Sequence, residues 1–333
     1  MAILVAGSEG EYALFENTLS SVGEDEKHRG SVLLSYGDEV YVEWTASNDV
    51  WVHVRFAGDD ESSNSSNTIP FFEIRNANGP LVYLESPDEF SSFGDLWSFT
   101  LYTADSNAAA THTAFGTTFS AGEYQFHDYD FRFQISGSDL TITMYRDGQR
   151  RFIRTISGGG WSNPTSLFMT CKDSSVDDEH RVYVQDVIVT DTIPTVGMEL
   201  ATLVPSAAGE YSDFGNDYTN IDEPGYDSSD VITTDAGAQR ESWIFGTPTF
   251  IVGDKLIYAV VLSNVAQLDL GGSVSDLRPF FRIDATNYDQ TALGVSSTAP
   301  ENYISIVETN PDTSQPWTTS DLLALEVGLL SVA

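Results

Sequence analysis

Acidic side chains are the most abundant groups in this sequence that could do chemistry. The chain contains 50 Asp and Glu residues, so a catalytic pair cannot be identified from frequency alone. Glycoside hydrolysis requires two carboxylates that flank the scissile bond. No strand-like segment carries paired glutamates, and the nearest pattern, Asp128-Tyr129-Asp130, places two acids on one strand face, where we expect them to be solvated. We therefore predict that the protein is not an enzyme.

Nucleophiles and soft metal ligands are equally sparse. His53, His112, His127 and His180 are scattered along the chain, and none has a Ser or Cys partner at a recognisable nucleophile turn. Cys171 is the single cysteine, which excludes an intrachain disulfide and leaves no ligand cluster for zinc or an iron–sulfur centre.

Two acidic loops have the oxygen-rich composition that calcium prefers. Asp173, Asp177 and Asp178 lie in one loop, and Asp59 and Asp60 open a Ser- and Asn-rich stretch. Calcium takes about six to eight oxygen ligands from such loops. Neither spacing follows a strict ligand pattern, so an ordinary solvated loop is the alternative at both places. Calcium is thus the one candidate cofactor.

Aromatic side chains offer a second kind of site, because they can stack on sugar rings. The candidates are Trp161, Trp97 and Tyr145, and for each the alternative is a place in the core. Trp161 is the strongest, since three glycines precede it and Ser162-Asn163-Pro164 follows, a context that predicts a loop tip.

The elements that would position these residues are almost all β-strands. About ten short alternating or aromatic-rich segments lie between turn clusters, with no helical pattern among them. Residues 50–56 alternate so that Val50, Val52 and Val54 share one face and Trp51 and His53 the other. Asn-Gly at 78–79 and Asp-Gly at 147–148 predict two β-hairpins. Ten strands of this kind favour a two-sheet antiparallel sandwich.

Composition limits the partners. Against 15 basic residues, the 50 acidic ones give a formal net charge of -35, so nucleic acid and anionic membrane surfaces are poor partners. The amino terminus lacks the cationic region of a signal peptide, and no run of about eighteen apolar residues predicts a membrane span. An acidic surface of this kind also suits a saline setting.

Residues 131–191 add a more specific pattern. The segments FRFQIS, LTITMYRDGQRRFIRTISG, SLFMTCKD and RVYVQDVIVTD follow one another in the order that resembles the laminin-G or concanavalin-like jelly roll. We predict an all-β chain: an amino-terminal arm with a first strand (1–39), an antiparallel β-sandwich of the concanavalin-like jelly-roll type (40–191), and a second, smaller β-sandwich domain (195–333).

The junction after this jelly roll and the carboxyl terminus resemble a group of tailed-bacteriophage virion proteins. The segments are VYVQDVIVTDTIPTVGMELATLVPSAAGEYSDF and NPDTSQPWTTSDLLALEVGLLS. The departure from that pattern is Gln185, where Ser-Glu is usual before the Val-Ile-Val run. The matched residues are Asp186, Val187, Ile188, Val189, Asp191, Thr192, Leu203, Pro205, Gly209, Pro311, Asp312, Pro316, Trp317, Thr318, Asp321, Leu325, Glu326 and Gly328.

This resemblance implies a structural virion protein, assembled in the host cytoplasm as a head decoration or a tail or fibre component. Its partners would be other virion proteins and host-surface glycans, with no nucleic acid and no membrane insertion. The alternative is a free lectin or a glycoside hydrolase of the concanavalin-like fold. We also expect a homo-oligomer, and a trimer is favoured because fibres and decorations on particles usually follow local three-fold axes. The terminal residues Leu322, Leu323, Leu325, Val327, Leu329 and Leu330 are too apolar for a free tail.

Overall fold

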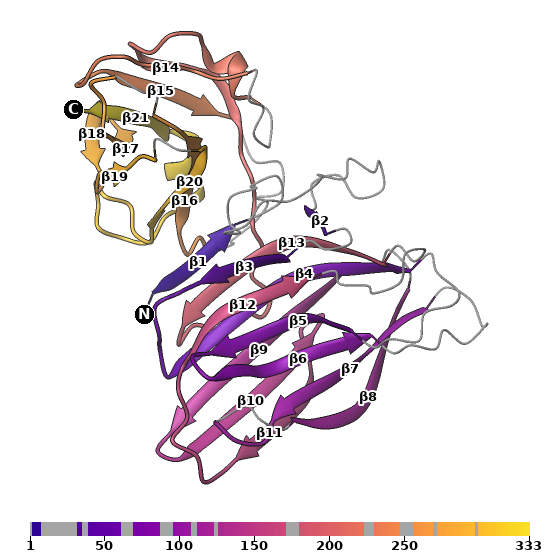
Figure 1. Ribbon diagram of the computed structural model, residues 1–333. Helices are drawn as coiled ribbons and strands as arrows, with labels where there is room; N and C mark the ends of the chain where they lie inside the picture. The colour runs from indigo at the N-terminus through magenta and orange to yellow at the C-terminus, as the bar shows by residue number, and fades with distance from the viewer. Residues whose placement is uncertain are drawn as a thin grey trace. The chain divides into compact units, whose positions relative to one another are not determined.

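The architecture comes from a computed structural model (Figure 1). It describes residues 2–7, 32–34, 39–60, 69–86, 96–107, 112–122, 126–170, 180–222, 230–246, 256–268, 272–296 and 299–333. The described residues form two compact units, which divide between Glu199 and Leu200. No helix among them is long and apolar enough to cross a membrane.

Unit 1 consists of two antiparallel sheets. The seven-stranded sheet has the order β1-β13-β4-β9-β10-β11, with β2 also paired to β13. Its strands are β1 (Ile3–Gly7), β2 (Val32–Leu34), β4 (Asp49–Asp60), β9 (His127–Ser136), β10 (Asp139–Arg146), β11 (Gln149–Ile156) and β13 (His180–Asp191). The six-stranded sheet has the order β3-β12-β5-β6-β7-β8. Its strands are β3 (Glu39–Glu43), β5 (Ile69–Asn76), β6 (Gly79–Ser86), β7 (Leu96–Ala104), β8 (His112–Gly122) and β12 (Pro164–Thr170).

The core of unit 1 lies between these sheets. Alternation along β4 turns Val50, Val52, Val54 and Phe56 inward, where each is at most 1% exposed. Phe56 contacts Phe72 of the other sheet with ring centroids 6.0 Å apart. Because both sheets contribute alternate residues to this layer, burial fixes the register of each strand. The prediction of an all-β chain with an antiparallel jelly-roll sandwich is confirmed.

Both predicted hairpins are present. β5 and β6 are joined by a turn at residues 77–78, and Gly79 has a φ of 128°. β10 and β11 are joined by Asp147 (φ 50°) and Gly148 (φ 72°), the left-handed pair that a two-residue hairpin turn needs. The pairing of β10 with both β9 and β11 fixes which side chains share the outer face of the seven-stranded sheet.

After β13 the chain turns back over that outer face. We call residues Thr192–Met198 the strap. The Thr192 N–H donates to the Asp49 carbonyl oxygen at 3.0 Å, and the Met198 N–H donates to the Thr195 carbonyl oxygen at 2.8 Å. Ile193 and Thr195 are 7% and 0% exposed. The strap therefore covers part of a sheet surface that would otherwise face solvent.

Unit 2 has one six-stranded antiparallel sheet, of order β14-β15-β21-β17-β18 with β19 also paired to β17, and a two-stranded ribbon, β16-β20. The strands are β14 (Pro205–Ser212), β15 (Arg240–Phe245), β16 (Val260–Ala266), β17 (Asp276–Ile283), β18 (Thr286–Asp289), β19 (Leu293–Gly294), β20 (Glu301–Val307) and β21 (Glu326–Val332). A 3-10 turn, η1 (Tyr218–Asn220), and one short helix, α1 (Thr319–Leu323), complete the unit.

The carboxyl-terminal strand is internal to this sheet. β21 pairs with β15 on one side and β17 on the other, and Leu325, Val327 and Leu329 are at most 8% exposed. The apolar terminus thus completes the core of its own unit. Leu325, Val327 and Leu329 therefore need no partner chain to be buried, whereas Leu323 of the same run is 58% exposed.

Helix α1 begins with a capping box. Thr318 is its N-cap, because its hydroxyl accepts from the Asp321 N–H while the Asp321 carboxylate accepts from the Thr318 N–H. Trp317, just before the cap, is buried and donates its indole N–H to the Val307 carbonyl oxygen at 2.7 Å.

Three more of the matched residues have a structural role in unit 2: Gly209 of the junction, and Glu326 and Gly328 of the carboxyl-terminal segment. The Glu326 carboxylate accepts from the Glu210 N–H at 2.7 Å and from the Ser242 hydroxyl, so it ties β14 and β15 to β21. A Cβ at Gly209 would lie 2.5 Å from this carboxylate, and one at Gly328 would lie 2.2 Å from a β15 carbonyl oxygen. These residues of the motif serve the fold of unit 2.

Candidate functional site

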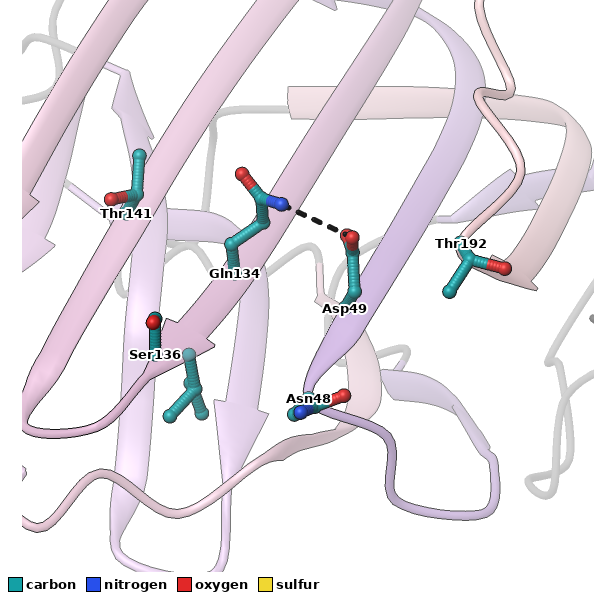
Figure 2. Close-up of a pocket in the computed structure, with 7 residues that line it drawn as sticks. Asn48, Asp49, Gln134, Ser136, Thr141 and Thr192 are labelled. Atoms are coloured by element: carbon teal, nitrogen blue, oxygen red, sulfur yellow. Dashed lines mark hydrogen bonds between the residues drawn. The ribbon is translucent and has the colours of Figure 1, made fainter.

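A polar hollow opens on the outer face of the seven-stranded sheet, at the ends of β4, β9 and β10 (Figure 2). Its volume is about 360 Å³, which lies within the range of small-ligand sites. Six of the seven lining residues are polar, and together they offer carboxylate, amide and hydroxyl groups. The lining residues are Asn48, Asp49, Gln134, Ile135, Ser136, Thr141 and Thr192.

Strand register brings these residues together. Asp49 of β4 pairs with Gln134 of β9, and Gln134 pairs with Thr141 of β10, so the three side chains form one row across the sheet. Thr192 belongs to the strap and reaches the same place because its N–H bonds to the Asp49 carbonyl oxygen. Figure 2 shows the Gln134 amide between Thr141 and Asp49.

Asp49 is held in a fixed orientation. Arg132 donates to both carboxylate oxygens, Nε to Oδ1 at 2.9 Å and Nη2 to Oδ2 at 2.7 Å, and Gln134 Nε2 donates to Oδ2 at 3.1 Å. The hydrogen bond to Asp49 raises the pKa of Arg132. The Arg132 guanidinium also lies 5.1 Å from the Trp51 ring centroid. The planar groups of Arg132 and Gln134 therefore hold the Asp49 carboxylate in one orientation, as a binding site requires.

A buried polar pair lies beneath the strap, on the same sheet face. His53 Nδ1 is 2.9 Å from Asp130 Oδ1, with the two side chains 2% and 1% exposed. The Thr195 hydroxyl donates to the same Asp130 oxygen at 2.7 Å. Asp130 Oδ2 and Trp51 Nε1 have no hydrogen-bond partner among the described residues.

The expectation that Asp128 and Asp130 are both solvated is therefore wrong for Asp130. The alternation was read correctly, since Asp130 does lie on the outer face. Asp130 is buried there because Thr195 of the strap and His53 both lie against its carboxylate. Thr195, His53 and Asp130 do not form a catalytic triad. A nucleophilic hydroxyl would bond to the histidine, whereas the Thr195 hydroxyl bonds to Asp130.

Asp186 borders this buried group. β13 carries a bulge between Val184 and Val187, opposite β4, and Asp186 lies in it. Burial raises the pKa of the Asp186 carboxyl, while nearby His53 and Arg55 act in the opposite direction. The bulge thus places a partly desolvated acid beside His53.

The three predicted sugar-stacking residues lie in different places in unit 1. Trp161 is 7% exposed, so its ring lies inside the unit and not at an exposed loop tip. A Cβ at Gly159 would be 3.1 Å from its indole nitrogen, so this glycine leaves room for the ring. Tyr145 is half-buried, and its ring lies 5.8 Å from that of Trp51. Trp97 lies in β7, opposite Ala121 of β8.

The predicted calcium ligands are only partly within the described residues. Asp173, Asp177 and Asp178 lie outside them. Asp59 and Asp60 end β4, where they pair with Arg181 and His180 of β13 and so belong to a strand rather than to a loop. In the part of the chain that is described, no three His, Cys, Asp or Glu side chains gather to hold a metal ion.

The hollow was not among the predicted sites. Its residues are common polar types from positions some 85 residues apart, and only the β4–β9–β10 register brings them together. The alternation in residues 50–56 was one usable signal. Trp51 and His53 point outward, so the same alternation assigns Asp49, two residues before Trp51, to the outer face.

The chemistry of the hollow is hydrogen bonding. Amide, carboxylate and hydroxyl groups can donate to and accept from the hydroxyls of a sugar. Among its described lining residues there is a single carboxylate, Asp49, and it is bound to Arg132. Hydrolysis by a pair of carboxylates therefore finds no second acid there.

Comparison with known proteins yields similarity in structure only. No family model and no curated protein matches the sequence. Among solved structures, an alginate lyase from Klebsiella pneumoniae is 12% identical, with 43% of this chain and 60% of that chain covered and a TM-score of 0.31. The botulinum neurotoxin serotype G binding domain is 9% identical, with 57% and 48% covered and a TM-score of 0.39.

A third similar structure is the lectin UEA-II in complex with galactose, 9% identical, with 58% of this chain and 100% of the lectin covered and a TM-score of 0.33. The chain spans less than two thirds of the lyase and of the toxin domain. At these identities and scores the similarities assign neither a family nor an activity to this protein.

Proposed function

We propose that this protein is a non-catalytic glycan-binding, adhesive protein, and that the polar hollow of unit 1 is its binding site. The observation that carries the proposal is the row of Asp49, Gln134 and Thr141, three hydrogen-bonding side chains in register on a rigid sheet. Asp49 is already oriented by Arg132, so little conformational entropy is lost when a hydroxyl binds.

The affinity of one such site is low. A net hydrogen bond contributes about 1 kcal/mol. If the polar lining residues make four such hydrogen bonds to one sugar, they give about 4 kcal/mol, which corresponds to a dissociation constant of about 1 mM. Adhesion at this affinity requires several copies that engage one surface together.

Gln134→Ala tests the site, because it removes the central amide of the row. Gln149→Ala is the matched control, since Gln149 is exposed at the opposite end of β10–β11. We expect an immobilised, multivalent array of the protein to bind a subset of glycans, and Gln134→Ala to abolish that binding while Gln149→Ala leaves it unchanged. Equal binding by both variants would place the site elsewhere, and an array that binds no glycan would refute the function.

A reducing-sugar assay on the bound glycans separates this proposal from its enzymatic alternative. Cleavage of a glycosidic bond, by hydrolysis or by elimination, creates one new reducing end for each bond broken. We expect none to accumulate. Release of reducing ends that stops in Gln134→Ala would make the hollow an active site, and the protein an enzyme of the alternative class.

The place of the protein in a virion is the second part of the proposal. It is supported by the sequence resemblance of the junction and the carboxyl terminus, which implies a head decoration or a tail or fibre component assembled in the host cytoplasm. Mass spectrometry of purified particles from the source should find this chain in fixed proportion to the other virion proteins. Its absence from the particles would refute the virion role and leave the glycan site untouched.

A further inference from the structure

The β16–β20 ribbon of unit 2 has one face on the core. Val260, Leu262 and Ala266 of β16, with Tyr303 and Val307 of β20, pack against the two core clusters of the unit. In the antiparallel register Val260 pairs with Val307, so these inward positions line up across the ribbon. The alternate residues must therefore point the other way.

The outer face of the ribbon is mostly apolar. It carries Val261 and Val265 of β16 and Ile304 and Ile306 of β20, all half-buried. Its polar residues are Ser263 and Asn302, and the Ser263 hydroxyl donates to Asn302 Oδ1 at 3.0 Å. Val261 pairs directly with Ile306. As far as the described residues go, none of the four packs in either core cluster of this unit. Just before β16, Leu256 is 77% exposed.

Charge is absent from this face. Residues 256–268 include no Asp, Glu, Lys or Arg, and β20 has only Glu301 at its start, whereas the whole chain is 20% charged with a net charge of -35. Two copies that meet elsewhere on such a surface bring carboxylates together. At the ribbon they can bury apolar side chains without that repulsion.

The same property selects the partner. A cationic protein would gain more by binding the acidic remainder of the surface. A glycan needs hydrogen-bonding groups, which valine and isoleucine lack and which Ser263 and Asn302 already use on each other. An equally acidic chain is the partner that benefits most from an uncharged contact. We propose that the outer face of the β16–β20 ribbon, formed by Val261, Val265, Ile304 and Ile306, is the contact between copies of this chain.

Sedimentation velocity of the full chain at tens of micromolar, in low and high sodium chloride, tests this interface. We expect oligomers that become more populated at high salt, because screening weakens the repulsion between the remaining surfaces. The double variant Val261→Glu/Ile306→Glu should sediment as a monomer. Ile153→Glu, at a 57% exposed isoleucine of unit 1, is the matched control and should behave as the wild type.

A milder pair, Val261→Thr/Ile306→Thr, keeps the branched shape that strands favour and should raise the dissociation constant about tenfold through lost apolar contact. Circular dichroism melting shows whether each variant is folded. A wild type that is monomeric at every salt concentration would overturn the proposal. So would folded double variants that associate as well as the wild type.

Discussion

Thr195→Val is the sharpest test of how the strap is held. The Thr195 hydroxyl donates to Asp130 Oδ1 at 2.7 Å, and the two side chains are 0% and 1% exposed. Valine has nearly the same shape, so the substitution removes the hydrogen bond without opening a cavity. The Asp130 carboxylate keeps His53 as a partner at 2.9 Å. The expected loss is therefore that of one buried hydrogen bond to a charged group, about 2 kcal/mol.

A loss of this size has two measurable consequences. If the strap opens locally, its amide protons should exchange with solvent about 30-fold faster, since about 1.4 kcal/mol is a factor of ten. The reporters are the Met198 N–H, bonded to the Thr195 carbonyl oxygen, and the Thr192 N–H, bonded to the Asp49 carbonyl oxygen. If unit 1 unfolds as a whole, its urea midpoint should fall by about 1 M, for a slope of about 2 kcal/mol/M.

The control is the same substitution at an exposed hydroxyl of the same sheet. Thr155 bonds to Thr141 at 2.9 Å in an exposed setting, so Thr155→Val should change the urea midpoint by about 0.2 M or less. Peptides from unit 2 serve as the internal reference in hydrogen exchange. If Thr195→Val left strap exchange and the midpoint of unit 1 at wild-type values, the buried bond to Asp130 would not be what holds the strap.

Three further predictions concern a buried carboxyl group, two glycines of unit 2 and the acidic loop that the sequence suggests for calcium. Burial raises the pKa of Asp186, so its contribution to stability is full below its unfolded pKa and is lost as pH rises through the folded value; Asp186→Asn should melt higher than the wild type at pH 7, with the gain vanishing near pH 3. Gly328→Ala should destabilise unit 2 by about 3 kcal/mol or more, whereas Gly246→Ala, with open space around its Cβ position, should melt as the wild type does. Thermal stability should rise with salt, and a further, saturable rise with calcium should vanish in Asp177→Ala but survive in Asp222→Ala if the acidic loop binds that ion.

The sequence predicted those features of the fold that depend on neighbouring residues, such as turns and strand faces. The Asn-Gly and Asp-Gly pairs indicate their hairpins because Gly79, Asp147 and Gly148 adopt positive φ at low cost. The alternation in residues 50–56 gave the inward face of β4 correctly. The capping box of helix α1 is equally local, since Thr318 and Asp321 act within a single turn.

Long-range coverage was not predictable from these patterns. Asp130 is buried where Thr195 of the strap, some 60 residues further along the chain, bonds to it, and Trp51 is covered by Tyr145 and Arg132. Nothing in the alternation of β4 or β9 shows that their outward residues will be covered. The terminal run around Val327 misled for the reverse reason, because its neighbours in the sheet, β15 and β17, are distant in sequence.

The low affinity proposed for the hollow makes adhesion depend on the contact proposed at the uncharged ribbon. A site of about 1 mM affinity holds a surface only when several copies bind together. A chain with a net charge of -35 resists being gathered in this way, and the strength of that resistance depends on salt. The β16–β20 ribbon provides a contact at which copies meet without adding to the repulsion. If both proposals hold, glycan adhesion should strengthen with ionic strength, although direct charge–charge binding would weaken. In Val261→Glu/Ile306→Glu the free chain should then bind glycans with the weak affinity of a single hollow at every salt concentration, and adhesion that still rose with salt would break the link between the ribbon and avidity.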